Sequence, residues 1–210
     1  MPLPGVEPFT ADQAQWFEGR QDAVSQVLAH LDEQRRVVLL LGPSGSGKSS
    51  LIQAGVLPAL AAGEVAGSDR WLPVRVRPGQ DLCAEIERAG LPGATTDGIA
   101  EPVTRMLRAQ PEYQRVVLVI DQFEELLTPQ EGNLAAADRL TAAITSHGAL
   151  SVILVMRDDF YPQLAALAPD LLEAAMPGLL NIPAGTGNSG RTDSHSASVM
   201  SDGYRRGRSG

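Results

Sequence analysis

A glycine-rich loop between a short apolar run and a candidate helix constrains this chain more than any other feature. The loop, residues 42–49 (GPSGSGKS), matches the pattern G-x-x-x-x-G-K-S/T at every fixed position. Before it, residues 35–41 (RRVVLLL) have the length and β-branched content of a strand buried on both faces. After it, residues 48–60 place apolar side chains at helical spacing, although Gly55 weakens the helix and Pro58 should end or kink it. This order of strand, loop and helix is typical of a phosphate-binding loop rather than of a plain Gly/Ser turn.

The basic residue of this loop stands apart from the rest of the chain. Of the 17 basic residues, Lys48 is the only lysine and the others are arginine. A lysine is a compact point charge on a slim stem, which fits between phosphate groups where a planar guanidinium does not. Backbone N–H groups of the loop and the following helix would bind phosphate oxygens. The candidate nucleotide-binding residues here are Gly42, Pro43, Ser44, Gly45, Ser46, Gly47, Lys48, Ser49 and Ser50.

An acidic cluster follows the most apolar strand candidate, which lies within residues 115–127 (RVVLVIDQFEELL). A phosphate loop needs an acidic partner at the end of a neighbouring strand, and Asp121 is placed to supply it. We expect Ser49 and Asp121 to hold Mg²⁺, which prefers oxygen ligands. Hydrolysis also needs a group that orients or deprotonates water, and Glu124 and Glu125 are both candidates. We favour Glu124 slightly over Glu125, but the first turn of a helix leaves both within reach and their spacing does not decide between them.

A second strand candidate ends on charged residues within 149–164 (ALSVILVMRDDFYPQL). Arg157 stands at its end, where a guanidinium can contact a γ-phosphate and stabilise charge that develops on the transferred group. The alternative is an ordinary salt bridge between Arg157 and Asp158 or Asp159.

The remaining pattern alternates strands and helices, which predicts an α/β fold with a mostly parallel sheet, helices on both faces and ligands at the carboxyl ends of the strands. Further elements are expected as helices at 20–33, 81–90, 100–110 and 133–148, a strand at 70–80, and a loop at 91–98. We predict an irregular lead-in (1–15), a core (16–183) and a disordered tail (184–210), since the tail has almost nothing able to form a core.

Composition narrows the classes of partner. The net charge of −8 and pI near 4.9 argue against nonspecific binding to nucleic acid or acidic membranes. The single cysteine, Cys83, is expected to be a small buried hydrophobe and cannot form an internal disulfide. No secretory signal is visible at the start, and no apolar run approaches the ~20 residues that span a bilayer. These features predict a cytoplasmic protein with no membrane insertion and make nucleic acid an unlikely partner.

Taken together, five segments resemble the bacterial novel STAND NTPases, a branch of the signal-transduction ATPases related to the AAA+ class. The resemblance covers roughly residues 8–183, and its segments are WFEGR (16–20), GPSGSGKSSLIQAGVLPAL (42–60), RPGQD (77–81), VIDQFEELLT (119–128) and VMRDDFY (155–161). It implies a P-loop NTPase three-layer sandwich that binds ATP and Mg²⁺, closes or oligomerises, and is reset by slow hydrolysis. It also implies that Gly19 and Arg20 lie near the base of the nucleotide, although such a turn is equally a plain helix start.

Residues 178–184 (GLLNIPA) resemble the last core strand of this family and its exit, and the chain departs from the family after them. Family members normally continue into a helical and winged-helix lid, whereas residues 184–210 here are rich in Gly, Ser and Arg. Three alternatives to a switch with ATP and ADP as ligands therefore stay open: a noncatalytic nucleotide-binding or interaction module, a P-loop kinase, and a fragment that does not fold stably. The family resemblance also allows self-association or contact with a partner protein.

Overall fold

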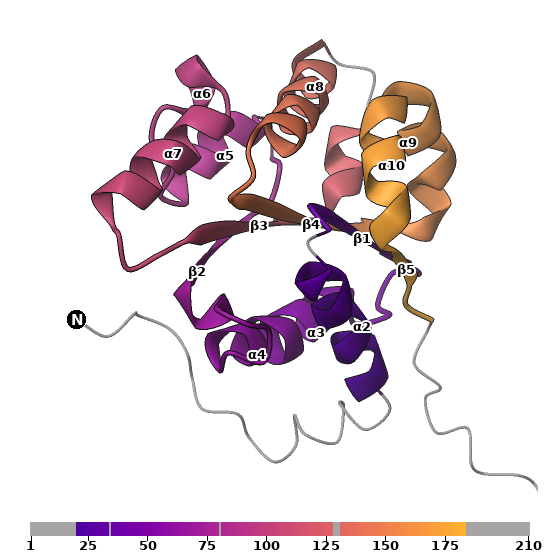
Figure 1. The fold of residues 1–210 in the computed structure, drawn as a ribbon. Coiled ribbons are helices and arrows are strands. Elements are labelled where there is room, and N and C mark those ends of the chain that lie inside the picture. Colours follow the sequence, from indigo (N-terminus) through magenta and orange to yellow (C-terminus); the bar gives the residue numbers. More distant parts are fainter. Residues whose placement is uncertain (1–19, 34, 80, 128–130, 184–210) are drawn as a thin grey trace, which may run out of the picture.

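Five parallel strands form the centre of the computed structural model, which describes residues 20–33, 35–79, 81–127 and 131–183 (Figure 1). The strands lie in the order β2-β3-β4-β1-β5, and each neighbouring pair is parallel. Their bounds are β1 Val37–Gly42, β2 Trp71–Val76, β3 Arg115–Asp121, β4 Leu150–Arg157 and β5 Leu179–Asn181. The predicted strands are therefore present, and all of their carboxyl ends face the same edge of the sheet.

The three inner strands are buried almost throughout, whereas the edge strand β2 alternates. Every residue of β1 is buried, and β3 and β4 are buried except at their ends. On β2, Val74 and Val76 are buried while Pro73 and Arg75 are exposed. Pro73 suits this position because an edge strand leaves backbone N–H groups unpaired, and proline has none to leave. The wetter face predicted from the alternation is confirmed.

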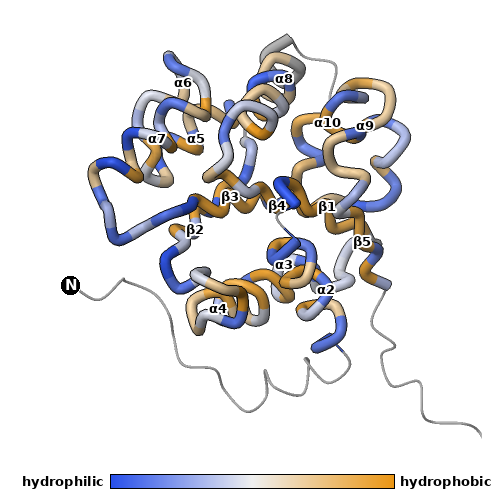
Figure 2. The backbone as a smooth tube through the Cα atoms, viewed as in Figure 1, coloured by the Kyte–Doolittle hydropathy of each residue, from blue (hydrophilic) through white to orange (hydrophobic). Residues whose placement is uncertain are grey.

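Helices cover both faces of the sheet (Figures 1 and 2). One face carries α2 (Gln21–Asp32), α3 (Lys48–Leu51) and α4 (Leu57–Ala61), and the other carries α5 (Leu82–Arg88), α6 (Ala94–Asp97), α7 (Ala100–Ala109), α8 (Glu131–Ser146), α9 (Tyr161–Leu167) and α10 (Pro169–Ala175). Alternate residues of β1 supply both cores: Val38 and Leu40 pack with the first set, and Leu39 and Leu41 with the second. This is the expected three-layer α/β sandwich.

The helix after the glycine-rich loop does not end at Pro58. It passes from α3 through a π-helical stretch, Ile52–Val56, into α4, whose first turn contains Pro58. Proline is tolerated in a first turn because its missing N–H is not needed there. The irregularity expected at Pro58 therefore falls one turn earlier, where Gly55 lies.

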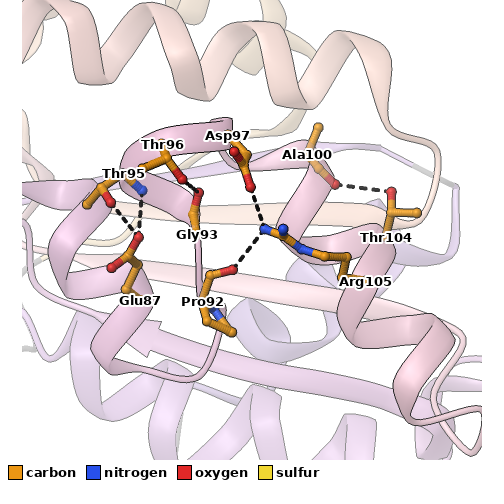
Figure 3. Close-up of polar contacts among 9 residues, drawn as sticks. All are labelled: Glu87, Pro92, Gly93, Thr95, Thr96, Asp97, Ala100, Thr104 and Arg105. Atoms are coloured by element: carbon orange, nitrogen blue, oxygen red, sulfur yellow. Dashed lines mark hydrogen bonds and ion pairs between the residues drawn. The ribbon is translucent and has the colours of Figure 1, made fainter.

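The loop predicted at 91–98 instead contains the one-turn helix α6. Its first turn is capped from a distance, since Glu87 Oε1 accepts the backbone N–H and the hydroxyl of Thr95 (2.9 and 2.5 Å; Figure 3). Arg105 of α7 binds the carboxylate of Asp97 at 2.8 Å. We call these four side chains the capping network. Because Glu87 and Arg105 belong to other helices, the local sequence alone did not predict α6.

Two further helices, α9 and α10, were not predicted. The strand expected within 149–164 ends at Arg157, and the chain turns through Asp158–Phe160 into α9. Both helices carry proline in the first turn, a signal for a helix start that the sequence does contain.

The chain leaving β5 lies against the start of the glycine-rich loop. Ile182 N–H donates to the carbonyl of Leu41 at 2.7 Å, and a Cβ on Gly42 would collide with the carbonyl oxygen of Ile182. The predicted lead-in and tail lie outside the described residues and stay predictions. No helix in the described ranges is both long and apolar enough to cross a lipid bilayer.

Candidate functional site

The glycine-rich loop joins β1 to α3 and holds its lysine in place. Lys48 Nζ donates to the carbonyls of Gly42 (2.7 Å) and Pro43 (2.9 Å) and lies 3.4 Å from Ser46 Oγ. Gly45 and Gly47 have φ values of 74° and 78°, a left-handed conformation that glycine adopts without a Cβ penalty. The loop is therefore already wrapped around the lysine ammonium.

The surroundings of Lys48 also change its pKa. Its side chain is buried, and this burial lowers the pKa of Lys48 from its ordinary value. The charges of Glu124, Asp158 and Asp121 oppose the change, while Arg157 adds to it. An anionic ligand beside the ammonium would favour its charged form and so oppose the effect of burial, as expected of a phosphate-binding lysine.

Two side-chain oxygens that could bind a metal lie close together beside the loop. Ser49 Oγ donates to Asp121 Oδ1 at 2.8 Å, although the residues come from α3 and the end of β3. Asp121 was expected on a strand next to β1, but β4 lies between them, so the contact passes over the end of β4. A hydroxyl and a carboxylate next to a phosphate loop fit Mg²⁺, which takes its other ligands from phosphate and water. No cluster of three or more His, Cys, Asp or Glu side chains suited to a metal occurs in the described ranges.

These groups share one polar cavity of about 480 Å³ at the carboxyl edge of the sheet. The strand register explains the convergence, because Gly42 pairs with Arg157 and Asp121 with Val155 at the ends of adjacent strands. The lining residues are Ser44, Gly45, Gly47, Lys48, Ser49, Ser50, Asp121, Gln122, Glu124, Val155 and Arg157. The structure thus brings together most of the residues predicted for nucleotide, metal and catalysis.

The two candidate glutamates both lie in the turn Phe123–Leu126, but their side chains have different surroundings. Glu124 lines the cavity, and its buried Oε2 has no hydrogen-bond partner in the described part of the chain. Glu125 is exposed, and its Oε2 accepts the N–H of Gly79 at 3.3 Å. An unpartnered buried carboxylate oxygen is unfavourable without a ligand, so the geometry favours Glu124 for contact with a ligand or water.

Arg157 reaches the cavity but is also held by a neighbour. Its Nε and Nη2 donate to the two carboxylate oxygens of Asp159 at 3.0 and 2.5 Å, and its guanidinium lies 5.2 Å from the ring centre of Phe160. The contact with Asp159 raises the pKa of Arg157 above its ordinary value. The salt bridge expected as the alternative is thus present, with Asp159 as the partner, while contact of Arg157 with a γ-phosphate stays a prediction that its place in the cavity wall permits.

Arg20 packs against the loop from the start of α2. A Cβ on Gly47 would lie 2.6 Å from Arg20 Nη1, so a larger residue there would displace the guanidinium from its present position. This Nη1 is buried and has no partner in the ranges that the structure covers. Arg20 therefore adds a cation beside the loop, while Gly19 lies outside the described residues.

Gln122 is a cavity residue that the sequence pattern did not single out. It has φ 59° and is the only residue other than glycine with positive φ in the described segments. This conformation costs a residue with a Cβ roughly 1–2 kcal/mol. The one sequence feature that could have identified Gln122 as a cavity residue is its position directly after Asp121.

A second hollow, of about 500 Å³, lies near the amino end of β1 and does not compete as a site. Arg36 there donates to the carbonyls of Ile144 and Thr145, and Arg35 pairs with Glu33. Its charged groups are thus already matched within the chain.

Solved structures show the same fold. The ORC2 protein of Aeropyrum pernix matches in its ADPNP–ADP complexes with a TM-score of 0.60 at 17% identity, covering 87% of this chain and 50% of that one. Its ADP form matches with a TM-score of 0.57 at 15% identity, with 87% and 51% covered. The Walker-type ATPase PABY2304 of Pyrococcus abyssi gives 0.50 at 15%, with 79% and 53% covered. The chain therefore spans about half the length of these proteins, and identities this low show the fold alone.

No curated protein matches the chain. The family model described as novel STAND NTPase 1, in contrast, matches residues 2–191, which is most of its length. This match includes the glycine-rich loop, the strand that ends at Asp121 and the strand that ends at Arg157. With the cavity at the carboxyl edge of a parallel sheet, it leads to one conclusion: the chain belongs to the novel STAND NTPase 1 family.

Proposed function

We propose that the chain binds ATP with Mg²⁺ and hydrolyses it slowly, as the nucleotide-controlled switch of a signalling protein. The observation that carries this proposal is the shared cavity in which Lys48 and the Ser49–Asp121 pair lie side by side. The family match supports a nucleoside triphosphate as the ligand, and the solved relatives with ADPNP and ADP support adenine as the base. Such a role places the protein in the cytoplasm.

Binding would begin with an exchange of partners at Lys48. The ammonium now bound to the carbonyls of Gly42 and Pro43 would turn to the β- and γ-phosphates, and the N–H groups of the loop would bind the β-phosphate. Ser49 and Asp121 would hold Mg²⁺, which would neutralise charge between the two phosphates. Arg20, packed on Gly47, would contribute a further cation to the same end of the nucleotide.

Hydrolysis would then use the acidic side of the cavity. A water molecule would attack the γ-phosphorus, the bond to the bridging oxygen would break, and ADP would leave with the electron pair. Glu124, whose Oε2 is buried with no partner among the described residues, would take the proton from the water. Arg157 would leave Asp159 and contact the γ-phosphate, which links the presence of that phosphate to the turn after β4.

A noncatalytic nucleotide-binding module is the second candidate, and one observation favours it. Arg157 is already neutralised by two hydrogen bonds to Asp159, so its release to a γ-phosphate competes with an existing interaction. Such a module would bind Mg²⁺–ATP but release no phosphate above the level of a Lys48→Ala variant.

The deciding experiment measures ATP binding by calorimetry with and without Mg²⁺. We expect the wild type to bind and Lys48→Ala to lose at least about tenfold in affinity, equal to about 1.4 kcal/mol. Arg105→Ala, which removes a cation outside the cavity, should leave affinity unchanged. Phosphate release by the same proteins then separates the switch from the module. Absence of binding by the folded wild type would contradict both.

A further inference from the structure

Gln122 occupies a strained position in the wall of the cavity. Its backbone angles, φ 59° and ψ 47°, are left-handed, and the residue lines the cavity together with Asp121 and Glu124. Left-handed residues other than glycine persist only where the surrounding structure enforces them, and they gather at functional sites. The conformation therefore calls for an explanation in terms of the turn, the side chain or both.

The turn explains the backbone. After β3 the chain must reverse at once, so that Phe123 enters the core, where it is fully buried, and Glu124 returns to the cavity. The carbonyl of Gln122 closes this turn by accepting the N–H of Glu125 at 3.0 Å. A glycine would make the same turn with no Cβ penalty, so the turn by itself gives no reason for a glutamine.

The neighbours of Gln122 explain what its side chain adds. Asp121 is engaged by the Ser49 hydroxyl at 2.8 Å, and Glu124 presents a carboxylate oxygen that no group in the described ranges contacts by a hydrogen bond. A primary amide has both donors and an acceptor, so it can hold a water molecule in a fixed orientation but does not take its proton at neutral pH. An amide and a free carboxylate in one wall can divide the two tasks.

We propose that Gln122 orients the water that attacks the γ-phosphorus, while Glu124 accepts the proton of that water. The inference rests on the proposed ATP hydrolysis. In the step, the water oxygen bonds to the γ-phosphorus, the bond to the β–γ bridging oxygen breaks, and ADP leaves with that electron pair. Glutamine side chains orient attacking water in other phosphate-loop enzymes, which shows that the chemistry is sufficient.

The test compares Gln122→Gly and Gln122→Asn with the wild type. Glycine removes the amide but eases the left-handed backbone, and asparagine tolerates that backbone but carries its amide one methylene shorter. Four quantities are measured for each protein: the melting temperature, the affinity for ATP, the affinity for ADP–aluminium fluoride, and the single-turnover rate. The fluoride complex imitates the transferred phosphoryl group, so it reports on the transition state without turnover.

We expect Gln122→Gly to melt at or above the wild-type temperature and to bind ATP within about twofold of the wild type, because the side chain is not needed for ground-state binding. Its hydrolysis rate and its affinity for ADP–aluminium fluoride should both fall at least about tenfold, since a misplaced reactant can lose about a hundredfold in rate. Gln122→Asn should lose activity in the same direction.

Two results would overturn the inference, and they differ from failure of the proposed function. If Gln122→Gly hydrolyses ATP and binds ADP–aluminium fluoride like the wild type, the residue serves only the turn. If both variants lose ATP affinity and hydrolysis in equal proportion, Gln122 is a ground-state binding residue. If the wild type binds ATP without hydrolysing it, the proposed hydrolysis is wrong, whatever the variants show.

Discussion

The cavity and the capping network differ in whether their polar groups have hydrogen-bond partners within the chain. In the capping network, Glu87 meets Thr95 and Arg105 meets Asp97, so its charges are matched within the chain (Figure 3). In the cavity, Glu124 Oε2 is buried without a partner in the described segments and Gln122 has a left-handed backbone; beside it, Arg20 Nη1 is likewise buried without a partner there. Unmatched polar groups lower stability unless a ligand completes them, whereas matched ones raise it. We therefore expect substitutions in the cavity to alter activity and substitutions in the network to alter stability.

Glu124→Gln should give the largest effect and tests the cavity side of this comparison. The amide keeps the shape of the carboxylate but cannot accept a proton, so hydrolysis should fall by about a hundredfold or more. Stability should not fall, because the substitution removes a buried charge. Phosphate release and urea unfolding measure the two quantities.

Glu125→Gln is the matched variant for that prediction. It makes the same change one residue later, at a side chain that is exposed and bonded to Gly79, and hydrolysis should be nearly unaffected. If the two variants exchanged their effects, the turn after β3 would present the other glutamate to the water.

Thr95→Val should give a moderate effect and tests the network side. The substitution removes the hydroxyl that Glu87 accepts while keeping the size of the side chain, and the free energy of unfolding should fall by about 1 kcal/mol. ATP affinity should be unchanged, because Thr95 does not line the cavity. A loss of affinity with no loss of stability would break the distinction between the two regions.

The smallest effect is expected from substitution of His147, which follows α8. Both of its ring nitrogens have hydrogen-bond partners within the chain, as the side chains of the capping network do. Its Nδ1 accepts the N–H of Ala149 at 3.2 Å, so its Nε2 carries the proton and donates to Thr104 Oγ1 at 2.9 Å. Burial lowers the pKa of His147. The neutral ring is thus favoured in the folded state, and its contribution to stability is complete above about pH 6.5 and is lost as the pH falls below it.

Urea unfolding at pH 7.5 and 5.5 checks this sign against His147→Gln. The wild type should lose more stability than the variant between these two values. An equal loss in the two proteins would show that other groups control the pH dependence.

The sequence predicted what depends on local pattern. Apolar runs located β1, β3 and β4, and the fixed positions of the glycine-rich loop were enough to single out Lys48. The helix predicted at 81–90 is present as α5, and Asp81 caps it by accepting the N–H groups of Cys83 and Ala84. Such features rest on neighbours along the chain, so one sequence suffices to find them.

What the sequence did not predict depends on residues far apart in the chain. The position of β4 between β1 and β3 is a property of the whole sheet, and the choice between Glu124 and Glu125 depends on how one turn meets Gly79. The left-handed conformation of Gln122 likewise follows from the simultaneous placement of Phe123 and Glu124, which the spacing of residues does not reveal.

The contact between Gly42 and Ile182 has a mechanical consequence. The first glycine of the phosphate loop and the chain leaving β5 touch through backbone atoms, and the adjacent Leu41 carbonyl is hydrogen-bonded to Ile182. Backbone atoms in contact transmit displacement directly, since no flexible side chain lies between them to absorb it. Displacement of the glycine-rich loop is therefore expected to move the chain that leaves β5, and displacement of that chain is expected to move the loop.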